Sequence, residues 1–446
     1  MNKSKNLFTK ILFTGMAITL VFISCSLAGD MDALREKTGE GGIVLPDPPG
    51  LPPPTIIVVE REGLDTLADK LTWLKTNAVS NSNYLLEVYE DESFEGGLYD
   101  KIDANYYLSY NGRSNITIYI KGKDEERVLS LKSQGILFGI GNGVTLILND
   151  NITFKGRNPN WATLVHVKEN ATLIMNTGAK LIDNKCNDFI AGAVWVEGGT
   201  FIMNGGEISG NSGGEAGGAV LLYGDVDQKS SFTMNDGLIT NNFSYTRGGG
   251  VSIEDSNSSF TMKGGEISNN KAGTESGGEG GGGVNAGGTF SMSGGKIKFN
   301  QAHEGGGVSA RGNFIMTGGE ITDNTAKEDP AGGGSGGGVA VDGKFTMNGG
   351  IIARNIAQGN TYGFGGGVYV NPALGTIMKA NGGTIFGHYS GAMDPDRNIV
   401  KNNSGSEKTG MGNAVYITST KKKEGTADIM VNLDSTKDGA GGGWFN

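Results

Sequence analysis

A phrase that recurs along most of the chain constrains its fold more than any other sequence feature. Each copy reads Phe-x-Met, then usually a glycine pair one position later, an isoleucine two residues beyond the pair and an asparagine three residues after that. Full copies begin at Phe201, Phe232, Phe260, Phe290, Phe314 and Phe345, and weaker ones at Leu173 and near Ile377. The starts of the full copies lie 24 to 31 residues apart. Such a period is typical of proteins that stack one structural unit on the next.

The apolar residues inside each copy alternate with period two, as in Phe201 and Met203. A second phrase of glycines followed by valine does the same, with the valines at Val220, Val251, Val284, Val308, Val339 and Val368. Alternation indicates short strands rather than helices. Such strands satisfy their backbone groups when each turn of chain stacks on the one before. We therefore predict an all-β fold, a right-handed parallel β-helix with three strands in each coil.

In-register stacking would place equivalent residues of successive copies directly over one another. The phenylalanines would form one inward ladder, methionine, isoleucine and valine would form others, and glycines would occupy corners where coils approach closely. The recurrent asparagines would bond the backbone of adjacent coils from a turn. These asparagines are Asn211, Asn242, Asn270, Asn300, Asn324 and Asn355. The outward residues after the glycine pairs are Glu207, Leu238, Glu266, Lys296, Glu320 and Ile351, a series without adjacent like charges, as stacking favours.

The ends of a solenoid need covering because they expose hydrogen-bonding edges. Leucines at helical spacing predict a short amphipathic capping helix over 65–78, within an amino-terminal region of irregular first coils over 55–170. Strands are expected there in YLLEVY, ITIYIKG, GILFGI and GVTLIL. Regular repeats follow over 171–420, with AVYITST as a closing strand, and a closing segment over 421–446 includes DIMVNLD.

The first residues are typical of an export signal. Three lysines precede an apolar run over 11–23, which predicts a signal peptide at 1–24. The run VFISC resembles the lipobox of bacterial lipoproteins, although Phe22 stands where leucine is usual. The resemblance implies a lipid with chains such as palmitate on Cys25, with residues 25–54 as a proline-rich tether. An ordinary signal with an incidental cysteine is the alternative.

The paired phrases resemble the passenger repeats of the bacterial polymorphic membrane protein family, marked by GGA[ILV] and FxxN. The chain has GGAV over 217–220 and FxxN at Phe201, Phe232 and Phe345, whereas other copies carry Lys263, Ser293 or Thr317 in place of the asparagine and GGGV in place of GGAV. The resemblance covers about 173–420 and implies a surface-exposed, adhesin-like or envelope protein. Only 26 residues follow Thr420, too few for that family's membrane domain, so the lipid would replace it as the anchor. We therefore expect export and attachment to the cell envelope, at the outer membrane or cell surface.

Charge and residue types narrow the function. The net charge is −10 without a long basic run, which argues against nucleic acid as a partner. We find no paired aspartate motif on neighbouring copies, and His166, His303 and His388 have no partner at metal or catalytic spacing, so we expect surface histidines. No catalytic residue, metal or cofactor is predicted. A carbohydrate-active lyase or hydrolase remains an alternative, because solenoids assemble sites from residues distant in sequence.

The inserts between each asparagine and the next glycine phrase vary in length, and insertions on one face of a solenoid often bind partners. They supply the candidate binding residues Phe243, Tyr245, Arg247, His303, Glu304, Lys327, Tyr362 and Phe364. The predicted partners are the membrane, through the lipid, and a host or matrix protein or a glycan, through these loops. A structural spacer without a specific ligand is the further alternative.

Overall fold

The computed structural model describes the chain from Thr55 to Leu433 with internal gaps. The gaps are 99–105, 189, 225–226, 274–279, 328–333, 361–362, 372–373, 380–381, 388–394, 408–412 and 418–430. The described residues belong to one compact unit. The signal peptide, Cys25 and the tether therefore lie outside the described residues.

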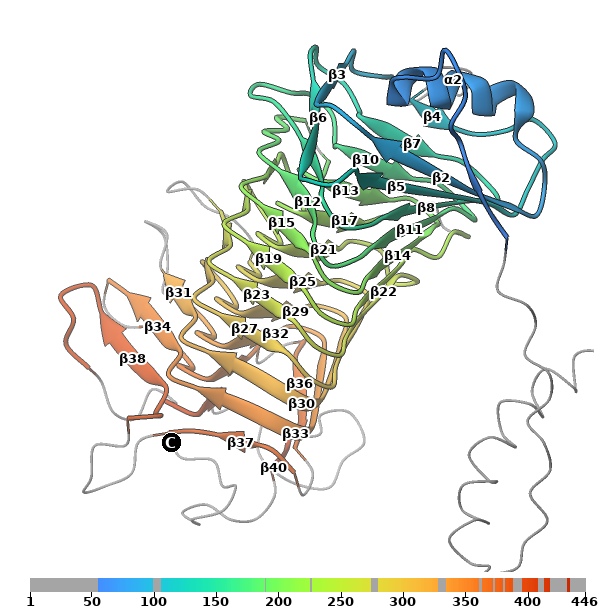
Figure 1. The fold of residues 1–446 in the computed structure, drawn as a ribbon. Coiled ribbons are helices and arrows are strands. Elements are labelled where there is room, and N and C mark those ends of the chain that lie inside the picture. Colours follow the sequence, from blue (N-terminus) through green and yellow to red (C-terminus); the bar gives the residue numbers. More distant parts are fainter. Residues whose placement is uncertain are drawn as a thin grey trace, which may run out of the picture. The chain divides into compact units, whose positions relative to one another are not determined.

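The described residues form the predicted all-β parallel β-helix with a short helix at its start (Figure 1). Three parallel sheets run along the stack, and each regular coil contributes to all of them. In Figure 1 the coils follow one another in chain order, from the blue and green strands to the orange ones. The predicted parallel β-helix is confirmed, and its coils form three sheets, although a regular coil such as 200–222 contributes four short strands to them.

The largest sheet has 22 strands and takes two strands, or one long bent strand, from each regular coil. Its first row is β1 (Ile56–Val58), β2 (Ser82–Val88), β5 (Ile116–Gly122), β8 (Val144–Leu148), β11 (Thr172–Met175), β14 (Thr200–Met203), β18 (Ser231–Met234), β22 (Ser259–Met262), β26 (Thr289–Met292), β30 (Asn313–Thr322), β33 (Lys344–Ala353), β36 (Thr376–Lys379) and β40 (Val431–Leu433). Its second row is β3 (Glu92–Phe94), β6 (Arg127–Leu131), β9 (Ile152–Lys155), β12 (Ala179–Ile182), β15 (Glu207–Ser209), β19 (Leu238–Thr240), β23 (Glu266–Ser268), β27 (Lys296–Lys298) and β37 (Thr384–Ile385), with β30 and β33 spanning both rows. The glycine pairs lie between the two rows.

The other two sheets complete each coil. The 11-stranded sheet contains the valine strands β4 (Tyr107–Leu108), β7 (Phe138–Ile140), β10 (Val165–Val167), β13 (Val194–Val196), β17 (Val220–Leu222), β21 (Val251–Ile253), β25 (Val284–Ala286), β29 (Val308–Ala310), β32 (Val339–Val341), β35 (Val368–Val370) and β39 (Val415–Ile417). The 7-stranded sheet contains β16 (Ser212–Gly213), β20 (Phe243–Ser244), β24 (Lys271–Ala272), β28 (Gln301–Ala302), β31 (Thr325–Lys327), β34 (Ile356–Gly359) and β38 (Ile399–Asn402). Its strands begin directly after the recurrent asparagines, inside the inserts that the sequence identified only as loops.

The phenylalanines form the predicted inward ladder. Phe201, Phe232 and Phe260 pair in register on successive strands, and Phe290, Phe314 and Phe345 continue the series. Adjacent ring centroids lie 4.6–4.9 Å apart with interplanar angles of 5–10°. All six rings are buried, together with the methionine, isoleucine and valine ladders. The predicted register of the coils is confirmed.

The recurrent asparagines form a second ladder that is buried. The backbone N–H and side-chain Nδ2 of each one donate to Oδ1 of the asparagine in the next coil, as from Asn242 to Asn270 at 3.0 Å each. The same Nδ2 group donates to a carbonyl of the preceding coil, Ile208 O in the case of Asn242. The ladder continues to Asn398, which the sequence pattern did not identify. The structural role expected for these asparagines is confirmed.

Glycine is required where the two rows of the large sheet meet. Gly319 has φ +85°, and a Cβ there would lie 2.5 Å from the Met292 methyl carbon of the preceding coil. A Cβ on Gly294 would lie 2.3 Å from the carbonyl oxygen of Lys263. Side chains are therefore excluded at these positions, because coils approach one another at the spacing of adjacent strands.

The helix α2 (Leu67–Asn77) lies within the predicted range 65–78. Thr66 is its N-cap and forms a capping box with Asp69, which accounts for its start. Leu67, Leu71 and Leu74 are buried against the main core. Within the described residues, no helix is long and apolar enough to cross a membrane.

Candidate functional site

The loop edge comprises the inserts that join each ladder asparagine to the next glycine phrase, and the structure divides its candidate residues into two groups. Phe243, Tyr245 and Arg247 follow one another along a single insert. His303, Glu304, Lys327 and Phe364 come from three later inserts. Tyr362 lies outside the described residues.

In the first group an aromatic pair lies at the surface, with Tyr245 exposed and Phe243 half-buried. The rings of Phe243 and Tyr245 meet edge to face, with centroids 4.9 Å apart. Tyr245 is 47% exposed. Arg247 instead pairs with Glu254, with 2.9 Å between its Nη1 and a carboxylate oxygen. The aromatic pair, rather than the arginine, is therefore the part of this insert that is available to a ligand.

A cleft of about 550 Å³ lies beside Tyr245, between successive inserts. Asp188 and Glu215 line it together with Asn187 and Thr246. A cleft of this volume is in the range of small-ligand sites. Asn187, Asp188 and Glu215, which were not identified from sequence, belong to the two preceding coils, whereas Thr246 directly follows Tyr245.

The second group lies further along the stack and includes a histidine contact. His303 Nδ1 lies 2.8 Å from the carbonyl oxygen of Lys327. Glu304 and Phe364 both pair with Ser335 through backbone bridges, which places their inserts in one row. This row connects residues 60 positions apart in the sequence.

Two tyrosines that the sequence analysis missed extend this second group. The ring of Phe364 lies 4.9 Å from that of Tyr416, which in turn lies 6.1 Å from Tyr369. Tyr369 and Tyr416 are in register on β35 and β39. The sequence did contain a signal for them, because each tyrosine stands between two apolar residues of its strand, a pattern that predicts an outward side chain.

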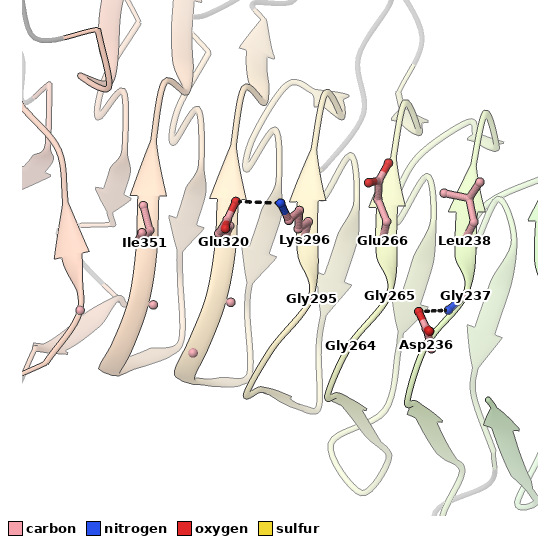
Figure 2. A pocket seen from close by; sticks show the side chains of 14 residues that line it. Asp236, Gly237, Leu238, Gly264, Gly265, Glu266, Gly295, Lys296, Glu320 and Ile351 are labelled. Atoms are coloured by element: carbon pink, nitrogen blue, oxygen red, sulfur yellow. Dashed lines mark hydrogen bonds and ion pairs between the residues drawn. The ribbon is translucent and has the colours of Figure 1, made fainter. Parts of the chain in front are cut away.

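A shallow trough of about 1040 Å³ runs along the large sheet where its two rows meet (Figure 2). Its floor consists of glycines, mainly Gly237, Gly265, Gly295, Gly319, Gly350 and Gly383. One wall presents Leu238, Glu266, Lys296, Glu320 and Ile351 from successive strands. With six coils at about 4.8 Å the trough is about 24 Å long. The glycine floor follows from the close approach of the coils described above.

Opposite charges are paired along this wall. Lys296 Nζ lies 3.5 Å from a carboxylate oxygen of Glu320, and Lys298 Nζ lies 2.9 Å from one of Glu266. Burial by itself raises the pKa of Glu266, but hydrogen bonds from Lys298 and Ser268 and the charges of Lys298 and Lys296 together outweigh it, so the pKa is lowered. Glu266 is therefore held as a carboxylate, the opposite of what a general acid needs.

His166 corrects the expectation that the histidines are surface residues. It is fully buried, stacked on Trp195 at 4.3 Å between centroids, and its Nε2 lies 2.8 Å from Glu197. Desolvation lowers the pKa of His166. Burial would raise the pKa of Glu197, but hydrogen bonds with His166 and Lys168 lower it to about 2. The group spans neighbouring coils, and only His166 is fully covered, since the side chains of Glu197 and Lys168 remain 22% and 34% exposed.

The thiol of Cys186 is another reactive side chain that lies away from the surface. Cys186 is buried, and burial raises the pKa of its thiol to about 12. A thiol of this kind is a poor nucleophile at neutral pH. Among the described residues, no group of three or more His, Cys, Asp or Glu side chains could hold a metal ion. His388 lies outside them.

Comparisons with known proteins do not assign the chain to a family. No protein-family model matches the sequence, no curated protein matches it and no solved structure matches the fold.

Proposed function

We propose that this chain is a bacterial cell-surface lipoprotein, adhesin-like or active in envelope interactions, that binds a host or matrix protein through the loop edge. The observation that carries the proposal is the exposed Tyr245, packed edge to face on the half-buried Phe243, beside the acidic cleft. Exposed aromatic residues are enriched where proteins contact one another. A glycan bound at the same edge is the second ligand class to test.

Two observations argue against the alternatives, a structural spacer and a carbohydrate-active enzyme. The trough is concave and the loop edge presents aromatic rings, features that a spacer does not need. A hydrolase needs one protonated carboxyl group in its groove. Glu266 has a lowered pKa and its carboxylate is paired with Lys298, and Glu320 is paired with Lys296, which supports binding over catalysis.

Adhesion assays test the loop edge. We expect replacement of Phe243 and Tyr245 by alanine to reduce binding to immobilised matrix proteins at least tenfold, because the exposed Tyr245 ring and the half-buried Phe243 ring that supports it are both removed. Tyr223→Ala is the matched control, since Tyr223 is 49% exposed but follows a strand of the 11-stranded sheet. Equal adhesion of the double variant and the wild type would remove this edge from consideration. If the wild type binds printed glycans and no matrix protein, the ligand of the loop edge is a glycan rather than a protein.

The lipid anchor has a separate test. We expect Cys25→Ser to abolish incorporation of labelled palmitate and to move the protein from the detergent phase to the aqueous phase, because several acyl chains are needed for durable attachment. Cys186→Ser is the control, since that thiol is buried. Retention of the label after Cys25→Ser would contradict the anchor.

A further inference from the structure

One row of residues has left-handed backbone along the stack. It consists of the residue directly before each ladder asparagine, with φ between 56° and 66°. The members are Asp183, Gly210, Asn241, Asn269, Phe299, Asp323 and Arg354. Glycine, asparagine and aspartate adopt this conformation readily, whereas a bulky aromatic residue is disfavoured. Phe299 is the aromatic exception in this row.

Burial does not compensate for this strain. The Phe299 side chain is 53% exposed, so most of an apolar ring faces water at a position where the two preceding coils carry asparagine. A strained residue that the fold does not need is a reason to look for a contact that it makes. The exposed face of the ring is therefore the starting point of the inference.

Phe299 adjoins the charged wall of the trough. It directly follows β27, whose outward residues are Lys296 and Lys298. Lys298 Nζ lies 5.6 Å from the centre of the Phe299 ring and also pairs with Glu266. An apolar ring, two ammonium groups and the carboxylates thus form one continuous strip that ends at the glycine floor.

We propose that Phe299 and the trough wall bind a linear, electrically neutral glycan. The wall offers carboxylates that accept bonds from hydroxyl groups and ammonium groups that donate to them. Both charge signs are present in equal number among Glu266, Lys296, Lys298 and Glu320, so a polyanion or polycation would meet repulsion as well as attraction. Phe299 supplies a flat apolar surface for the ring face of a sugar. A floor without side chains leaves room for a chain along several coils.

Phe299→Asn tests the contact against a purely structural role. The backbone strain is relieved by the residue that the neighbouring coils use, so we expect the melting temperature to rise. Binding of the full-length protein in detergent to neutral linear oligosaccharides is expected to fall at least tenfold. Phe299→Tyr, which keeps the ring, should retain binding. Unchanged binding by Phe299→Asn would overturn the proposal, whatever happens to the melting temperature.

A second variant tests the binding site in case Phe299→Asn impairs folding. Replacing Lys296 and Glu320 together by alanine removes both members of an exposed ion pair and leaves no unpaired charge. We expect it to weaken binding about fivefold without a change in melting temperature. If Phe299→Asn lowers the melting temperature, the double alanine variant of Lys296 and Glu320 is used instead. Unchanged glycan binding by that double variant would then overturn the proposal.

The ligand class is tested on a printed array of neutral, acidic and basic linear oligosaccharides. Preference for the neutral chains supports the proposal. Binding confined to acidic or basic chains, binding to none of them, or binding of matrix protein that Phe299→Asn abolishes would each overturn it. The Phe243 and Tyr245 double variant must bind these glycans as the wild type does, so this inference and the loop-edge function can fail separately.

Discussion

Replacing Asn300 with alanine is expected to lower the free energy of unfolding by about 3 kcal/mol or more, because buried groups lose their partners. The Asn300 side chain accepts from the backbone N–H and the Nδ2 group of Asn270, at 2.9 and 3.0 Å. It also donates to Ile267 O and to Asn324 Oδ1. Alanine removes all four bonds, and the residue is 1% exposed, so water cannot replace them without opening the stack.

The matched control is Asn235→Ala. Asn235 belongs to a separate ladder on the surface, where its Nδ2 donates to Asn204 Oδ1 at 2.8 Å. Water can replace that bond, and we expect a loss below about 1 kcal/mol. Urea unfolding measures both variants, and amide exchange at Asn270 reports the local effect. Equal losses for the buried and exposed asparagines would contradict the explanation.

Phe290→Ala is expected to cost about 3–5 kcal/mol of unfolding free energy, the range for removing a buried aromatic side chain. The Phe290 ring lies 4.9 Å from Phe260 and 4.8 Å from Phe314, so both contacts and the cavity add to the cost. Neighbouring coils cannot close the gap, since their strands are held in register on both sides.

Phe299→Ala provides the control from the same coil. That ring is 53% exposed, and alanine keeps the unfavourable positive φ, so little stability should be lost. Chemical denaturation compares the two variants. A loss below about 1 kcal/mol at Phe290 would mean that the phenylalanine ladder is not a main support of the core.

The candidate site was only partly predictable from sequence. The sequence pattern indicates only loops in the inserts, whereas the third sheet starts inside them, at positions such as Phe243 and Thr325. Its signal was the buried alanine two residues after the asparagine, as in Ala272 and Ala302, which is too short a pattern to separate from a turn. Whether these loops bind a ligand stays a prediction.

Other features depended on contacts that no local pattern contains. His166 is buried by Trp195 and Glu197, which lie 29 and 31 positions further along the chain. The phenylalanine, methionine and asparagine ladders were readable from sequence, because one residue type at one position of every coil fixes both the register and the inward face. The trough, its paired charges and the strain at Phe299 were decided by the tertiary structure, because they arise between unlike residues of coils whose lengths differ.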